Sequence, residues 1–123
     1  LQVSPVNEVP LDYDRLWQNF RAELSITTNK DRDYLHWRYV EAPYISYTLI
    51  ELRSDHMLEG FAVVRVQETA VGSVLRIMEL IASTKWRNTA FQGLVLYAEQ
   101  MGALFSDFFV RPRIPNSELR FFV

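Results

Sequence analysis

The carboxylate of Glu79 is the side chain in this sequence that is best placed for chemistry. It belongs to the run Ser73–Ser83, which alternates like a β-strand and is largely apolar on both faces, as a central, covered strand would be. A carboxylate in such a position can serve as a general base. The alternative is an ion pair with a neighbouring arginine such as Arg65 or Arg76, because structural ion pairs perturb carboxylates as readily as catalysis does.

A second candidate feature is an aromatic cluster around Arg38. Its members are Tyr34, Trp37, Tyr39, Tyr44 and Tyr47. Aromatic rings with an arginine among them could line a substrate cleft or stack a base or a sugar. Ordinary core and edge packing is the commoner role of such residues. Near the end of the chain, Arg111 and Arg113 could meet a phosphate, and a solvated loop is the alternative.

Other chemistries are excluded by the residues that the sequence lacks. It has no cysteine, so a disulfide framework, a thiol nucleophile and a thiolate metal site are ruled out. His36 and His56 have no carboxylate at ligand spacing, so we expect no metal site. No serine lies in the glycine-flanked turn of a nucleophile elbow. A formal charge of -2 gives nucleic acid or an anionic membrane surface no electrostatic attraction.

Length and composition indicate one soluble domain. The 123 residues are 49% hydrophobic and 23% charged, which supports a single packed core over residues 1–123 and excludes disorder for most of the chain. No apolar run is long enough to cross a bilayer, and the first ten residues do not resemble a signal peptide, so we place the protein in the cytoplasm. Because the sequence opens on Leu1 and stops in a strand-like run, we expect it to be a fragment of a longer protein.

Two helices should come first. Aromatic and aliphatic residues recur at helical spacing over residues 12–24, with Asp12 or Asp14 available as the N-cap. Thr28 and Asp31 resemble a capping box that starts a second, shorter helix. That helix should end before Pro43, because the residue preceding a proline is pushed out of the helical region.

Three strand-like runs follow, over residues 44–53, 60–67 and 73–83, with short turns that favour an antiparallel meander. Strict alternation in the third run would place two sets on opposite faces: Leu75, Ile77, Glu79, Ile81 and Ser83 against Val74, Arg76, Met78, Leu80 and Ala82.

Helical spacing returns over residues 90–101, Gly102 supplies a stop, and residues 103–110 form a fourth strand. A strand, a helix and a strand in succession form a βαβ unit with parallel strands. We therefore expect a mixed α/β (α+β) fold with two N-terminal helices, a three-strand antiparallel meander and a crossover to a parallel strand. Leu80, Leu94 and Tyr97 should be mostly buried between the last helix and the sheet.

This order of elements resembles the GNAT acyl-CoA N-acyltransferase superfamily over roughly residues 11–110. Two stretches carry the resemblance, Glu79–Ser83 with the following Lys85–Leu94, and the apolar helix closed by Gly102. Arg87 stands where the family's R/Q-x-x-G-x-G/A loop begins, while Ala90 occupies its glycine position and Gln92 its glycine-or-alanine position. Residues 32–39 also look like the second helix of GNAT-like domains found in larger bacterial proteins.

The resemblance implies a function and a set of site residues. The protein would transfer an acetyl group from acetyl-CoA to a small-molecule amine, with Glu79 taking a proton from the attacking ammonium. The backbone of Ile81, Ala82 and Ser83 would bind the pantetheine arm of the cofactor. Its pyrophosphate would lie against Arg87, Asn88, Thr89 and Ala90, where a helix begins.

Two other functions stay open at this stage. The first is a catalytically silent GNAT-like module for assembly or substrate recognition, whose partner would be the remainder of a longer chain or a second GNAT-like domain. It is favoured by the side chains of Ala90 and Gln92, because the backbone of a pyrophosphate loop must come close to the phosphates. The second is a ligand-sensing domain of the PAS type, which would have a purely antiparallel sheet.

Overall fold

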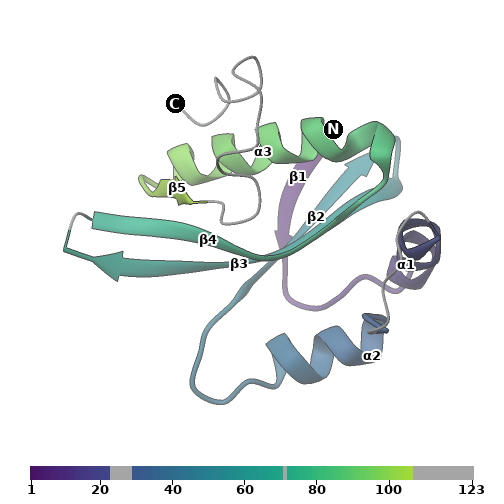
Figure 1. Cartoon of the computed structure of the whole chain (residues 1–123), viewed down its shortest axis with the longest axis horizontal. Helices are drawn as coiled ribbons and strands as arrows, with labels where there is room; N and C mark the ends of the chain where they lie inside the picture. The colour runs from purple at the N-terminus through teal and green to yellow at the C-terminus, as the bar shows by residue number, and fades with distance from the viewer. Residues whose placement is uncertain (23–28, 71, 107–123) are drawn as a thin grey trace.

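A single mixed β-sheet forms the centre of the molecule. The computed structural model describes residues 1–22, 29–70 and 72–106 (Figure 1). Across these ranges the strands follow the spatial order β1-β2-β3-β4-β5. They are β1 (Gln2–Val6), β2 (Thr48–Ser54), β3 (Met57–Thr69), β4 (Gly72–Ala82) and β5 (Leu104–Ser106).

The meander and the crossover have the expected directions. β2, β3 and β4 pair antiparallel in succession, although their ends differ from the predicted runs by several residues. β4 pairs parallel with β5, from Val74↔Leu104 to Arg76↔Ser106. The rest of the predicted fourth strand, residues 107–110, lies outside the described residues. The parallel pair excludes the purely antiparallel sheet of the ligand-sensing alternative.

β1 corrects the expectation that two helices come first. It pairs antiparallel with β2, from Gln2↔Arg53 to Val6↔Leu49, and lies at the edge of the sheet. Pro5 has no N–H to donate, and an edge strand is where a sheet tolerates proline. A short strand that contains proline lacks the usual strand pattern, which is why the sequence did not reveal it.

Helices cover both faces of the sheet (Figure 1). On one face lie α1 (Tyr13–Arg21) and α2 (Arg32–Leu35), which continues into a π-helical turn, His36–Val40. α3 (Arg87–Gln100) lies on the other face, after a 3-10 turn at Thr84–Trp86. The core is accordingly split in two, one cluster under α1 and α2 and another under α3.

The caps of the first two helices differ from the prediction. Asp12 stands at the N-cap of α1 but makes no side-chain cap, because both of its oxygens accept hydrogen bonds from Arg53. This guanidinium lowers the pKa of the Asp12 carboxyl. Asp31, predicted as the second member of a capping box, is itself the N-cap of α2 and accepts from the Tyr34 N–H at 3.0 Å. Thr28 lies outside the described residues.

A β-bulge in β4 overturns the predicted division of its faces. Val63 pairs with Glu79 and Val64 with Ile77, so Met78 is an extra residue between two ladder positions. The alternation of side chains between the two faces of β4 therefore shifts by one residue at Met78. As a result Leu75 and Ile77 join Leu80 and Ala82 under α3, whereas Ile81 and Met78 pack in the cluster under α1 and α2.

α3 seals the second cluster with Leu94. This side chain is fully buried, as predicted, while Leu80 and Tyr97 are partly buried and pack against the same cluster. We expect Leu94→Ala to lower the free energy of unfolding by about 2 to 5 kcal/mol, because it removes buried methyl groups and leaves a cavity. Urea denaturation measures the loss. A loss below about 0.5 kcal/mol, which is the usual effect of surface substitutions, would contradict this packing.

Gly93 lets α3 approach β1 closely. A Cβ at this position would lie 2.7 Å from Val3 Cγ2 and 3.8 Å from Leu52 Cδ2. We expect Gly93→Ala to destabilise the protein by about 1 to 2 kcal/mol, because overpacking outweighs the better helix propensity of alanine. In a Val3→Ala background the same substitution should become neutral or stabilising. An equal effect of Gly93→Ala in both backgrounds would contradict the contact.

Candidate functional site

Glu79 is a buried carboxylate whose two oxygens are both occupied. Its exposed fraction is 7%, and among the described residues it is the one buried side chain that is charged. Lys30 Nζ lies 2.8 Å from Oε1, and the Tyr39 hydroxyl donates to Oε2 at 2.7 Å. The predicted structural alternative, an ion pair, is therefore present, but its partner is a lysine that the sequence did not point to.

The elements around Glu79 explain its position. The bulge at Met78 turns Glu79 towards the face that carries α1 and α2. Lys30 precedes α2, and its own carbonyl accepts a hydrogen bond from the buried Tyr13 hydroxyl at 2.8 Å. Tyr39 lies in the π-helical turn, which is closed by a hydrogen bond from the Glu41 N–H to the His36 carbonyl. π-turns occur frequently at functional sites.

Neighbouring groups hold the Tyr39 ring in place. Arg38 Nε donates to the Tyr39 hydroxyl at 3.2 Å, and the Arg38 guanidinium carbon lies 5.4 Å from the centre of the ring. The ring of Tyr47 meets that of Tyr39 edge to face, with centres 4.9 Å apart. Burial, and then the hydrogen bond to the Glu79 carboxylate, raise the pKa of the Tyr39 phenol far above its ordinary value. The hydroxyl therefore stays protonated at neutral pH.

The two arginines that the sequence offered as partners of Glu79 lie elsewhere. Arg65 and Arg76 stand opposite each other on β3 and β4, on the other side of the bulge from Glu79. Arg76 Nε donates instead to Gln67 Oε1 at 2.6 Å. The expectation of an arginine partner fails because it assumed a regular strand.

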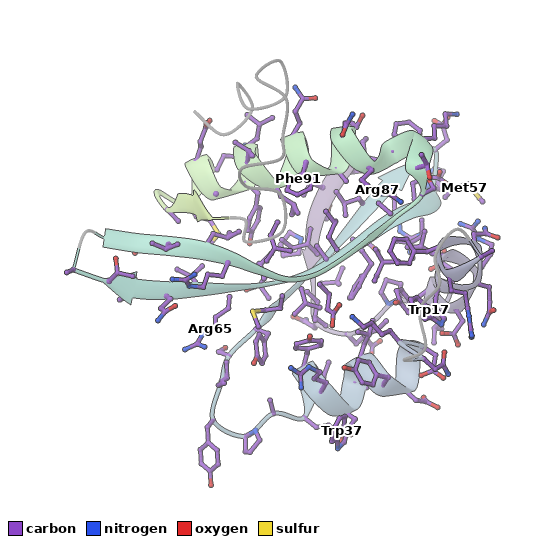
Figure 2. The ribbon with its side chains drawn as sticks, in the orientation of Figure 1. Trp17, Trp37, Met57, Arg65, Arg87 and Phe91 are labelled. Carbon is purple, nitrogen blue, oxygen red and sulfur yellow. The ribbon has the colours of Figure 1, made fainter. Side chains whose placement is uncertain are left out.

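The aromatic cluster of the sequence separates into different environments. Trp37 is 66% exposed and points away from the sheet (Figure 2), with its ring 6.2 Å from that of Tyr34. Tyr44 is 96% exposed. Tyr39 and Tyr47, by contrast, pack together beside the first core cluster. Only this inner pair reaches Glu79, through the Tyr39 hydroxyl.

A pocket of about 500 Å³ opens beside Tyr39 and Tyr47. Its walls come from the end of β1, at Val6 and Asn7, from the end of the π-helical turn and from the loop over residues 42–47 that leads into β2. Tyr39 both lines the pocket and donates its hydroxyl to Glu79 in a buried hydrogen bond. The pocket and the buried carboxylate are joined by one side chain.

The predicted cofactor-binding residues lie together where β4 leads into α3. Ile81 and Ala82 are buried in the sheet, and the Ser83 carbonyl accepts from the Trp86 N–H at 3.0 Å. Within the described chain, Ser83 Oγ is buried with no hydrogen-bond partner. Arg87, at the start of α3, directs Nη2 to the Ala82 carbonyl at 3.4 Å (Figure 2).

The first turn of α3 has backbone N–H groups that no carbonyl of the helix accepts from. Trp86, at the N-cap, provides no side-chain cap, and the first N–H groups of a helix have no helical acceptor. Asn88 and Thr89 lie in this turn. Ala90 is fully buried in the core cluster under α3, whereas Gln92 is exposed. The Ser83 hydroxyl, which has no partner within the described chain, and the uncapped first turn of α3 therefore suit an anionic, hydrogen-bonding group. Ala90, in contrast, packs in the core under α3.

Several solved structures share this arrangement of elements. No family model matches the sequence, and no curated protein matches it. An aminoglycoside acetyltransferase from an uncultured soil metagenomic sample has a TM-score of 0.59 at 14% identity, covering 98% of this chain and 83% of that one. A GNAT family acetyltransferase from Staphylococcus aureus has a TM-score of 0.58 at 11% identity, covering 94% and 92%.

A third neighbour is the aminoglycoside 6'-N-acetyltransferase of Acinetobacter haemolyticus, with a TM-score of 0.54 at 11% identity, covering 92% of this chain and 82% of that one. The chain has a GNAT-like fold. The resemblance of the sequence to GNAT proteins is thereby confirmed at the level of fold. None of the helices in the described ranges is long and apolar enough to cross a membrane.

The site around Glu79 contains two residues whose contacts the sequence did not show. Lys30 is separated from Glu79 by 49 positions, and no local pattern connects them. Tyr39 was noticed as one of several aromatic residues, but its bond to Glu79 depends on the bulge and on the π-helical turn. Arg111 and Arg113, the candidate phosphate contacts, lie outside the described residues.

Stability in alkali tests the environment of Tyr39. The unfolded phenol ionises near pH 10, whereas the folded one keeps its proton because its pKa is raised. Above about pH 10 the unfolded state binds fewer protons, so the free energy of unfolding falls as pH rises. Wild type should lose up to about 1.4 kcal/mol per pH unit more than Tyr39→Phe, measured by urea denaturation from about pH 9 to 11. Equal slopes would place the phenol in solvent.

Proposed function

We propose that residues 1–123 form a single GNAT-type N-acyltransferase domain, which transfers an acetyl group from acetyl-CoA to an amine. One observation carries the proposal, namely that Tyr39 lines an open pocket and donates to the buried Glu79 carboxylate at 2.7 Å. The GNAT-like fold supports it, because the structural neighbours are acetyltransferases. The acceptor amine would enter the pocket.

Tyr39 connects the acceptor to the base. An amine that arrives as an ammonium must lose a proton before its nitrogen can attack a carbonyl. Both oxygens of Glu79 are engaged, so the proton passes through the phenol: Tyr39 accepts it from the ammonium and at once gives its own proton to Oε2. The raised pKa of Tyr39 makes a free phenolate unfavourable, so the two transfers occur together. Lys30 remains on Oε1 throughout.

The residues after Glu79 would hold the cofactor, which supplies an activated thioester carbonyl when bound. Ile81, Ala82 and Ser83 would meet the pantetheine arm, and the buried Ser83 hydroxyl lacks a partner within the described chain. Arg87, Asn88, Thr89 and Ala90 would meet the pyrophosphate at the uncapped first turn of α3.

A silent GNAT-like module for assembly or substrate recognition is the second candidate. It is favoured by the burial of Ala90, whose methyl group belongs to the core under α3, and by Gln92. Ala90 occupies a position at which the GNAT loop has glycine, and Gln92 one at which it has glycine or alanine. A side chain there restricts how closely a phosphate can approach the backbone.

Acetyl-CoA distinguishes the two candidates. The enzyme should bind it in isothermal titration with a dissociation constant tighter than about 1 mM, equivalent to about 4 kcal/mol, and should release free CoA when amines are added. Glu79→Gln and Tyr39→Phe should each reduce the rate of CoA release by about 10² to 10⁴-fold, the usual contribution of acid–base catalysis.

Two control variants separate these effects from general disturbance. Tyr34→Phe removes a hydroxyl from the same helical segment, away from the pocket lining, and Glu99→Gln neutralises an exposed carboxylate on α3. Both should keep the wild-type rate. Binding of acetyl-CoA weaker than about 1 mM would refute the enzyme and leave the silent module. Full activity in Glu79→Gln would instead refute the role of Glu79 as the base.

A further inference from the structure

The pocket beside Tyr39 has the size of a small-molecule site. Its volume of about 500 Å³ lies within the range of about 300 to 1,000 Å³ that ligand pockets occupy. The walls come from segments far apart in the sequence, the end of β1 and residues 39–49. A site assembled in this way has a fixed frame, because β1 and β2 are paired along their whole shared length.

The chemistry of the walls is aromatic and neutral. Tyr39, Tyr47 and the exposed Tyr44 are among the lining residues, while Asn7 and Ser46 add uncharged hydrogen-bonding groups. Among the described residues that line the pocket, none carries a charge. The carboxylate within reach is Glu79, which lies behind Tyr39 and is already paired with Lys30.

We expect these uncharged walls to discriminate between amines by the number of ammonium groups that each amine carries. In the proposed reaction one ammonium gives its proton to the Tyr39 hydroxyl, which donates to Glu79 and accepts from Arg38. Any further ammonium would find no carboxylate among the described residues that line the pocket, so it would gain no ion pair there. Tyrosine rings and amide or hydroxyl groups are, in contrast, suited to the faces and hydroxyls of an uncharged ring.

We infer that this pocket is the acceptor site and that it selects an amine with one amino group on an uncharged ring, either a sugar or an aromatic ring. The inference rests on the proposed function and adds the class of acceptor. It separates this chain from structural neighbours that act on aminoglycosides, which carry several amino groups.

Binding to the protein without acetyl-CoA tests the site independently of turnover. Glucosamine, tyramine and sisomicin are titrated into the ¹⁵N-labelled chain, and amide shifts are followed by NMR. We expect glucosamine or tyramine to shift the amides of Asn7 and residues 44–47, and sisomicin to bind there at least 10-fold more weakly. The stronger of the first two identifies a sugar or an aromatic acceptor.

Charge variants provide the decisive comparison. Asn7→Asp adds a carboxylate to the pocket wall and should improve sisomicin binding at least 10-fold, with a smaller effect on the monoamine. Asn19→Asp, on an exposed position of α1 and outside the pocket, should not change either affinity. Sisomicin binding as tight as the monoamine in wild type, or no probe shifting the pocket amides, would overturn the inference.

The two proposals fail in different ways. If acetyl-CoA binds and turns over but the monoamines leave the pocket amides unshifted, the acceptor assignment is wrong and the enzyme stands. If acetyl-CoA fails to bind while a monoamine occupies the pocket, the acyltransferase is wrong and the pocket remains a monoamine site of the silent module.

Discussion

The hydrogen-bonded ion pair at Glu79 is the constraint on which the rest of the structure depends. A carboxylate this deeply buried costs several kcal/mol unless its charge and lone pairs are satisfied. Lys30 and Tyr39 provide that satisfaction from two sides, and both belong to the helical layer over the sheet. α1 is tied to the same point, because the Tyr13 hydroxyl binds the Lys30 carbonyl. The central strand and the helical layer therefore have one mutual position, and the pocket beside Tyr39 follows from it.

The bulge in β4 creates this arrangement. It turns Glu79 and Ile81 towards α1 and α2, while Leu80 and Ala82 face α3. If Met78 occupied an ordinary ladder position, the strand would present the carboxylate on the same face as Leu75 and Ile77, which lies in the apolar core under α3. A bulge re-aims the side chains that follow it in the strand, and such irregularities are over-represented next to active sites.

The sequence allowed the fold to be predicted where the signal is local and repeated. Helical spacing around Leu94, strand alternation before and after the bulge, and the strand–helix–strand order were enough for the parallel β4–β5 pair. The failures have physical causes. β1 contains Pro5, so its pattern is weak. Asp12 has the chemistry of an N-cap, but the charged Arg53 competes successfully for its oxygens.

The site could be predicted only in part for the same reason. Glu79 was identifiable because a carboxylate interrupts an apolar strand, and Tyr39 because it lies among aromatic residues. Their contact was not identifiable, since it joins residues 40 positions apart across two irregular features. Lys30 is one lysine near a helix start, and nothing local marks it as the partner of a buried charge.

A double-mutant cycle tests the central interaction most directly. The free energy of unfolding is measured for wild type, Tyr39→Phe, Glu79→Leu and the double variant. The hydrogen bond from a phenol to a buried carboxylate should give a coupling energy of about 1.5 to 3 kcal/mol. A coupling below about 0.3 kcal/mol, which is the error for independent sites, would show that Tyr39 and Glu79 do not interact and would contradict the account.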